Sequence, residues 1–397
     1  MSPRIAGPLV TLASITIALI LAEAGYRIYL SSDSRLTYNA ISNPIVAFDS
    51  LAGFTYVPGS QASALCIRNG IPRFHFDLRV GPHGDLGGGS GNWDSADVRI
   101  LGFGDSFTAD PFSYNSWTTY LAGELSTPEG KTAAVMNFGR DATGVLQMTR
   151  MAAQKVPLYR PDIAVVAFIM DDLSRARFWR TMRTVDGNTR LLTMPVADPA
   201  VDITVAEDVA LIDLRIERGW GERIVAHNSP DDPLLKDLHR RYRELASENY
   251  RYGLWSLPTS FLYHRIVHSD PYFAARKPSH FPQFTARDLR EDGGFSRDMR
   301  MLDSAGVRIV WIRIPTVTDL HAGRYTGSDQ QEQLLGSLRA CMGTSQVMVD
   351  LLPHMNLGGT PPDSLFLLPY DAHPSERGAR AYAKAIASAI APFLQSH

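Results

Sequence analysis

Three side chains in this sequence could together turn an alcohol into a nucleophile. Ser106 follows the apolar run 98–103 and a Gly-Asp pair, where a buried strand would turn sharply into a helix. Asp371 and His373 stand two residues apart near the C-terminus, just before another helical pattern. A serine hydroxyl is a weak nucleophile until a base takes its proton and a third group orients that base. The three residues therefore predict a nucleophile, a base and an orienting carboxylate acting on an ester.

Each part of this constellation also has a simpler interpretation. Gly-Asp-Ser is a common tripeptide, and Asp105 could serve only to cap a helix. His373 could be a loop residue before a helix, with Pro374 in its first turn. The catalytic interpretation is favoured because other segments of the chain follow in a matching order.

Four segments resemble the sequence blocks of the GDSL/SGNH hydrolase family, over about residues 98–395 and with a poorly matched middle. Gly-Asp-Ser-Phe-Thr at 104–108 resembles the first block, whose serine is the nucleophile, and Asn-Phe-Gly-Arg-Asp-Ala-Thr-Gly-Val-Leu-Gln at 137–147 resembles the second. The strand-like run 164–172, which ends in Met-Asp-Asp, resembles the third block, usually Gly-Asn-Asp. Asp-Ala-His-Pro-Ser-Glu-Arg-Gly at 371–378 is similar to the last block, which carries the Asp and the His. The resemblance implies a serine esterase with a Ser106-His373-Asp371 triad.

The same resemblance implies an oxyanion hole with one unusual member. Its donors would be the N–H groups of Ser106 and of Ala142, which replaces a glycine, and the side chain of Asp171, which replaces an asparagine. An ionised carboxylate donates no hydrogen bond, and the loss of one donor costs roughly 3–4 kcal/mol. Asp171 could donate in a protonated form if burial and Asp172 raise its pKa, or another group could replace it. Alternatively, Asp171 and Asp172 cap the segment that begins at Leu173.

The order of elements predicts a sheet that would position these residues. Apolar runs at 98–103, 133–137, 163–169, 307–314 and 347–351 are typical of strands buried on both faces. Helical patterns lie between them at 116–125, 147–156, 295–305 and 329–342. The predicted fold is an α/β three-layer sandwich with a central parallel sheet of about five strands, SGNH/flavodoxin-like. Ser106, Ala142, Asp171 and His373 then fall after strands or in loops that enter helices, where active groups gather in such sheets.

The N-terminus carries a candidate membrane segment. Residues 6–22 contain no charge and lie between Arg4 and Glu23. Their length falls between a signal-peptide core of about 7–15 residues and a spanning helix of about 20. Glu23 and Arg27 are four residues apart and could pair on one helix face. We expect an uncleaved single-pass signal anchor with the catalytic domain outside the cytoplasm, a cleaved signal peptide or a buried helix being the alternatives.

We therefore divide the chain into an anchor at 1–30, an irregular extracytoplasmic leader at 31–97 and a hydrolase domain at 98–397 with an insertion at about 173–294. In the leader, 49–60 predicts a short strand with a Pro-Gly turn, 73–80 an edge strand and the Gly-rich stretch 84–91 a loop. In the insertion, 178–183 and 189–194 predict a hairpin and 231–249 a surface helix.

Composition limits the remaining possibilities. The chain has 397 residues, 45% of them hydrophobic and 20% charged, which is typical of a globular protein. A net charge of −2 argues against nucleic acid as a partner. Cys66 and Cys341 are too few for a metal cluster, and their pairing stays open. His264 and His268 have a metal-ligand spacing but lack the Glu of a metalloprotease, so we expect neither a metal nor a cofactor.

The predicted function is hydrolysis of a carboxylic ester, with O-acyl groups on a cell-surface glycan or a lipid as candidate substrates. One alternative is an O-acyltransferase that uses the same serine to acylate an exported polysaccharide. Some members of the resembled family do so, and they share the short Asp-x-His arrangement. A second alternative, suggested by Asp171, is a non-catalytic binding module that keeps the fold.

Overall fold

The computed structural model describes residues 3–32, 38–41, 45–50, 52–68, 71–109, 116–125, 130–175, 178–185, 188–195, 215–216, 262, 285–368 and 372–394. Its strands are β1 (Tyr38–Ile41), β2 (Val46–Asp49), β3 (Gly53–Tyr56), β4 (Gln61–Arg68), β5 (Ile71–Arg79), β6 (Leu86–Ser90), β7 (Val98–Gly104), β8 (Ala133–Asn137), β9 (Ile163–Phe168), β10 (Phe178–Val185), β11 (Asn188–Pro195), β12 (Arg215–Ile216), β13 (Arg308–Arg313) and β14 (Gln346–Asp350). Its α-helices are α1 (Pro3–Ser32), α2 (Ser106–Ala109), α3 (Trp117–Leu125), α4 (Val145–Tyr159), α5 (Met170–Ser174), α10 (Ala286–Glu291), α11 (Gly293–Ser304), α12 (Val317–Ala322), α13 (Asp329–Ala340) and α14 (Glu376–Leu394).

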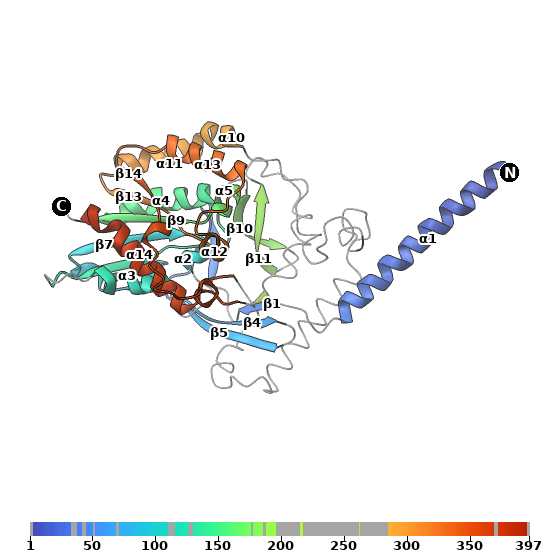
Figure 1. The fold of residues 1–397 in the computed structure, drawn as a ribbon, viewed down its shortest axis with the longest axis horizontal. Coiled ribbons are helices and arrows are strands. Elements are labelled where there is room, and N and C mark those ends of the chain that lie inside the picture. The colour runs from blue at the N-terminus through green and yellow to red at the C-terminus, as the bar shows by residue number, and fades with distance from the viewer. Residues whose placement is uncertain are drawn as a thin grey trace.

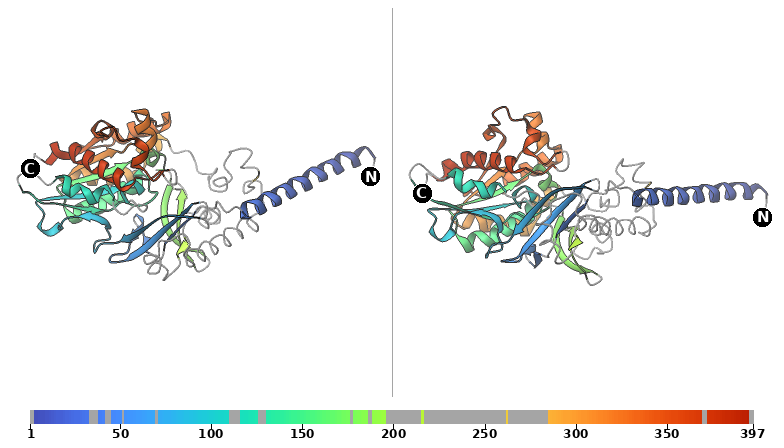
Figure 2. Two further views of the ribbon diagram at one scale, coloured as in Figure 1. Left: turned by 60° about the horizontal axis from the view of Figure 1, so that its bottom comes forward. Right: turned by 90° about the horizontal axis from the view of Figure 1, so that it is seen from below.

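The main sheet has six strands in the order β14-β13-β9-β7-β8-β6. The first five are parallel, and β6 pairs antiparallel with β8 at one edge. Helices cover both faces of this sheet (Figures 1 and 2). The predicted α/β sandwich with about five parallel strands is therefore confirmed, with one antiparallel edge strand added.

Two hydrophobic cores explain why the parallel strands read as continuous apolar runs. Side chains alternate between the faces of a strand, so each central strand contributes to both cores. Phe103, Phe168 and Trp311 pack toward α4, α11 and α13 on one face. Ile100 and Val165 pack toward α3 and α14 on the other. All five of these side chains are fully buried.

The Gly-rich stretch that we expected to be a loop forms the edge strand β6. A Cβ added at Gly89 would lie 2.5 Å from the carbonyl oxygen of Val135 on the neighbouring β8. The close approach of the two backbones therefore requires glycine at this position. The glycines that suggested flexibility instead allow tight strand pairing.

The segment before β7 is also more regular than the irregular leader that we expected. The strands β12-β1-β4-β5 form a second sheet, and β2 and β3 form a hairpin. The expected edge strand is β5, at the end of that sheet, and the expected strand before a Pro-Gly turn is β3. β2 pairs with β3 and β4 pairs with β5, each its neighbour along the chain, whereas β1 pairs with the distant β12, a partner that local patterning does not reveal.

In the predicted insertion, β10 and β11 pair antiparallel as expected, with Phe178 opposite Pro195. This hairpin packs against β2 and β3. The helix predicted at 231–249, together with His264 and His268, lies outside the described residues. Cys341 is a free thiol at the end of α13.

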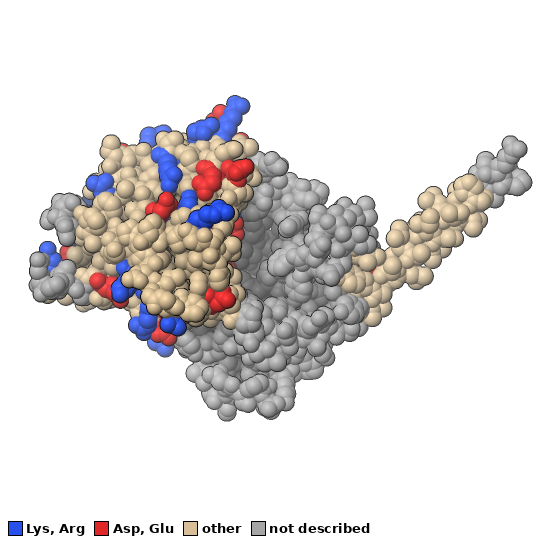
Figure 3. All heavy atoms as spheres, viewed as in Figure 1, with Lys and Arg blue, Asp and Glu red and all other residues tan. Residues whose placement is uncertain are grey.

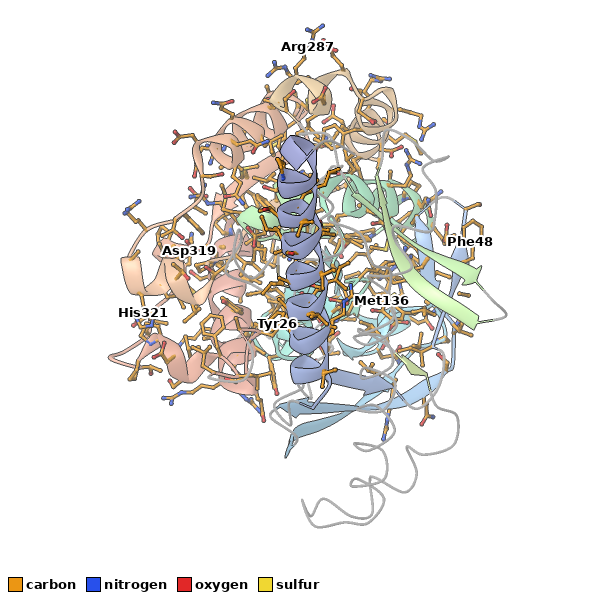
Figure 4. All side chains as sticks on the ribbon, turned by 90° about the vertical axis from the view of Figure 1, so that its right-hand side faces the viewer. Tyr26, Phe48, Met136, Arg287, Asp319 and His321 are labelled. Carbon is orange, nitrogen blue, oxygen red and sulfur yellow. The ribbon has the colours of Figure 1, made fainter. Side chains whose placement is uncertain are left out.

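The N-terminal helix α1 extends away from the α/β body (Figure 1). Its segment Gly7–Ile28 is long and apolar enough to cross a membrane. Its described outer turns show no charged side chain in Figure 3. Near the other end, Glu23 and Arg27 form the expected ion pair at 2.6 Å, both buried, and the Leu262 N–H donates to Glu23 at 2.9 Å. Figure 4 faces this side of the molecule, with Phe48 of β2 and His321 of α12 on opposite flanks of the helix.

Candidate active site

Ser106 is the first residue of α2, two residues after the end of the central strand β7. The turn between them is tight, because a Cβ at Gly104 would lie 2.1 Å from the Thr108 hydroxyl oxygen and 2.5 Å from the Ala167 carbonyl oxygen. Only glycine fits there, so the sharp turn predicted from the Gly-Asp-Ser sequence has a steric basis. The turn places Ser106 at the carboxyl edge of the sheet, with 4% of its surface exposed.

Asp105 orders this turn through the backbone. Its Oδ1 accepts a hydrogen bond from the Phe107 N–H at 2.8 Å. Its carbonyl oxygen accepts from the N–H groups of Thr108 and Ala109, at 3.0 and 2.8 Å. The capping role considered for Asp105 is therefore present in the structure.

His373 meets Ser106 although 267 positions separate them in the chain. The distance from His373 Nε2 to Ser106 Oγ is 2.8 Å, a normal hydrogen bond. The backbone fixes the histidine loop on both sides: the Leu367 N–H donates to the His373 carbonyl at 2.9 Å, and the Ser375 N–H donates to Leu365 at 2.8 Å. The Phe107 ring packs against the imidazole, with 5.5 Å between centroids. Asp371 lies outside the described residues.

The loop between β8 and α4 lies against the same turn. Asn137 holds it, since its Oδ1 accepts from the Gly139 N–H and its Nδ2 donates to the Thr108 carbonyl, both at 2.9 Å. The Arg140 N–H donates to the Gly104 carbonyl at 2.8 Å. The next residue but one, Ala142, has a φ of 53°, in the left-handed region that favours glycine.

A hairpin from the N-terminal part of the chain supports this loop from outside. Arg140 Nη1 and Gln147 Nε2 both donate to the Ala52 carbonyl between β2 and β3, at 3.4 and 2.6 Å. The Arg140 guanidinium lies 5.3 Å from the Phe54 ring centroid. Burial lowers the pKa of Arg140 to about 10. The hairpin therefore belongs to the scaffold of the site.

Asp171 and Asp172 begin the short helix α5 but point to different surroundings. Asp171 is exposed, and its Oδ1 accepts from Gln331 Nε2 at 3.0 Å. Asp172 is fully buried, and its Oδ2 accepts from the Ile169 N–H at 3.0 Å. The capping role that we considered for this pair is therefore present in Asp172, while the role of Asp171 in an oxyanion hole stays a prediction.

Arg175 joins the two carboxylates that flank the nucleophile, and sequence reasoning did not single it out. Its Nη1 donates to Asp105 Oδ2 at 3.0 Å and to Asp172 Oδ1 at 2.7 Å. Neither carboxylate is exposed. The signal in the sequence was the spacing of Asp172 and Arg175, which lie three residues apart after a buried strand.

Burial and charge perturb this cluster strongly. Burial raises the pKa of the Asp172 carboxyl well above its ordinary value, and the charge of Asp105 adds to this more than Arg175 opposes it. Burial of Arg175 disfavours its charged form, but Asp172 and Asp105 outweigh that effect and raise its pKa above the ordinary value. Arg175 therefore stays charged, while burial and the neighbouring Asp105 favour the protonated form of Asp172.

No family model and no curated protein sequence matches the chain. Three solved structures that it resembles illustrate the range of matches. A lipase/acylhydrolase from Enterococcus faecalis is 12% identical over 74% of this chain and 95% of its own, with a TM-score of 0.36. An α/β hydrolase from the metagenome of Lake Arreo, Spain, is 9% identical over 76% and 99%, with a TM-score of 0.38. An acetylxylan esterase from Geobacillus stearothermophilus is 12% identical over 76% and 96%, with a TM-score of 0.35.

Proposed function

We propose that this protein is a serine esterase whose nucleophile is Ser106 and whose general base is His373. The observation that carries the proposal is the distance of 2.8 Å between Ser106 Oγ and His373 Nε2 at the carboxyl edge of a parallel sheet. A nucleophile and base within hydrogen-bond reach are what acyl transfer through serine requires.

In the proposed reaction, Ser106 Oγ attacks the ester carbonyl while His373 Nε2 takes the hydroxyl proton. His373 then returns the proton to the leaving alcohol, and an acyl group stays on Ser106. Water, deprotonated by the same histidine, releases the acid and restores the serine. Asp371 is the proposed third member, holding the imidazole tautomer and stabilising its cation.

The proposed oxyanion hole uses the backbone N–H groups of Ser106 and Ala142. Among the described residues, neither N–H donates a hydrogen bond in the structure, so both are available to a substrate oxygen. The positive φ of Ala142 is a conformation that glycine adopts readily, which agrees with the glycine at this position of the resembled block. Asp171 Oδ1 accepts a hydrogen bond from Gln331 in the structure. An ionised carboxylate has no hydrogen to donate, so Asp171 would serve the hole only in its protonated form.

We also propose that α1 anchors the enzyme in a membrane, with the catalytic domain outside the cytoplasm. The length and exposed apolar surface of Gly7–Ile28 support this. Esters at or near a membrane surface, such as O-acyl groups on a glycan or a lipid, are then the proposed substrates.

The test is hydrolysis of p-nitrophenyl acetate by the full chain in detergent micelles, comparing wild type with Ser106→Ala. We expect the variant to lose at least about a thousandfold in kcat/KM. Ser304→Ala, which removes an exposed hydroxyl that donates to the Met301 carbonyl, is the matched control and should keep wild-type activity. Turnover that survives in Ser106→Ala, or a wild type that neither hydrolyses the ester nor reacts with a phosphonate ester, would overturn the proposal.

A further inference from the structure

The Ser106 hydroxyl has two acceptors within reach. His373 Nε2 lies 2.8 Å from Ser106 Oγ, and Asp105 Oδ2 lies 3.4 Å from the same atom. A hydroxyl carries one proton, so it can donate to only one of them at a time. Only the bond to His373 leads to attack in the proposed reaction, because it allows the base to take the proton.

Arg175 already donates a hydrogen bond to the competing acceptor, Asp105 Oδ2. Asp105 Oδ1 is engaged by the Phe107 N–H, which leaves Oδ2 for the hydroxyl. The bond from Arg175 Nη1 to Asp105 Oδ2, at 3.0 Å, is shorter than the contact from Ser106 and joins two charged groups. It therefore weakens Asp105 as an acceptor for Ser106 and leaves the hydroxyl to His373.

Arg175 also offsets negative charge beside the developing oxyanion. Asp105, next to the nucleophile, and Asp172 are both fully buried, and Asp141 and Asp171 are also close enough to act on Arg175. Without the guanidinium, the negative charge that remains on this group of carboxyls would oppose an oxyanion on the substrate and would favour the cationic form of His373.

We propose that Arg175 is a positioning residue that, by holding Asp105, directs the Ser106 hydroxyl to His373 and neutralises the carboxylates beneath it. This inference rests on the proposed function of Ser106. A single nitrogen, Nη1, contacts both carboxylates, so an ammonium group should replace the guanidinium in part. A side chain without charge should not.

The experiment compares Arg175→Met and Arg175→Lys with wild type, and uses Arg150→Met as the matched control. Arg150 lies on α4 and pairs with the buried Asp298 of α11. We measure kcat, KM, the rate of phosphonate labelling and the pH profile of kcat/KM. The fold of each variant is checked by thermal unfolding.

For Arg175→Met we expect kcat and the labelling rate to fall at least about tenfold, with KM changed less than about twofold. The acid limb of the pH profile should move to higher pH, because uncompensated carboxylates stabilise the imidazolium of His373. Arg175→Lys should recover activity to within a few-fold of wild type, and Arg150→Met should leave the profile unchanged.

The proposal is overturned if wild type is active but a folded Arg175→Met keeps its kcat and its pH profile. It is also overturned if Arg150→Met shifts the profile equally, since the effect would then be structural. Should Arg175→Met fail to fold, the double variant Arg175→Met/Asp105→Asn removes the charge that Arg175 offsets. We expect it to fold and to keep the acid limb at the wild-type position, and a displaced limb in it would overturn the proposal. An inactive, unlabelled wild type would instead end the proposed function itself.

Discussion

The molecule contains two buried ion clusters with opposite composition. Beneath the nucleophile, one cation, Arg175, contacts two carboxylates. Between α4 and α11, one carboxylate, Asp298, contacts two cations, Arg150 and Arg297. The first cluster has a surplus of acid and the second a surplus of base.

The two clusters differ in how the charge that has no partner is stabilised. At the helix interface, 57% of the Arg297 side chain is exposed, so water solvates the extra cation. In the catalytic turn, Asp105 and Asp172 have no exposed surface, so water cannot solvate the extra anion. Burial beside Asp105 instead favours the protonated form of Asp172. The cluster at the helix interface can be purely structural, while the cluster beneath the nucleophile raises the pKa of a carboxyl close to the reacting atoms.

Removing one carboxylate from each cluster tests this distinction and should give the largest change in stability. Asp298→Asn leaves two arginines without their counter-ion and should lower the free energy of unfolding by about 2 kcal/mol. Asp172→Asn puts an amide of the same shape in place of a carboxyl whose pKa is already raised, so it should cost less than about 1 kcal/mol near neutral pH. Urea unfolding of the full chain in detergent measures both. A loss in Asp172→Asn equal to that in Asp298→Asn would mean that Asp172 is ionised.

The strands that are buried on both faces of the sheet could be predicted from the sequence. β7, β9 and β13 were located because strands covered on both faces are apolar at every position. β6 was wrongly expected to be a loop, because the need for glycine there arises from β8, a partner about 45 residues further along the chain. In the same segment, β1 pairs with β12, a partner about 175 residues further along the chain.

The candidate site shows a similar division. Ser106 and His373 were identified because their types and order predict chemistry, and the structure places them in contact. Arg175 was not identified, because its importance depends on Asp105, which lies 70 residues away in sequence and joins it only in the folded chain. Charged residues of this kind acquire a role from their neighbours in space, which their own sequence context does not show.

The pH dependence of stability should separate Asp172 from an ordinary surface carboxylate. The pKa of Asp172 is raised above 3.8 in the folded protein, so between about pH 4 and its raised value the folded state binds the extra proton. Stability from this group is therefore lost as pH rises through that window. Relative to wild type, Asp172→Asn should become more stable from pH 4.5 to pH 8.

Asp303 provides the matched control with the opposite sign. Hydrogen bonds from the backbone and side chain of Ser345 lower the pKa of Asp303 below 3.8. Its contribution is present above the unfolded pKa and is lost as pH falls, so Asp303→Asn should become less stable, relative to wild type, as pH rises from 3 to 6. Parallel slopes for the two variants would contradict a raised pKa of Asp172 in the folded protein.

The smallest expected effect concerns backbone strain, again at one position in the site and one in the helical framework. Ala142 and Arg160 are the non-glycine residues with positive φ in the described chain, at 53° and 46°. Glycine relieves about 1 kcal/mol of strain at such a position but costs about as much in the entropy of the unfolded chain. Ala142→Gly and Arg160→Gly should therefore each change the free energy of unfolding by less than about 0.5 kcal/mol.

Substitutions at Ala142 and at Arg160 differ in what they reveal about the site. Ala142→Gly keeps the N–H proposed for the oxyanion hole, so ester hydrolysis should stay within about twofold of wild type. Ala142→Val retains that N–H but places a β-branched side chain at positive φ, which should shift the loop and lower kcat at least about tenfold. Arg160→Val, at the end of α4, carries the same strain with no donor to displace and should lower stability without lowering kcat. Equal loss of kcat in the two valine variants would place the oxyanion donor elsewhere than Ala142.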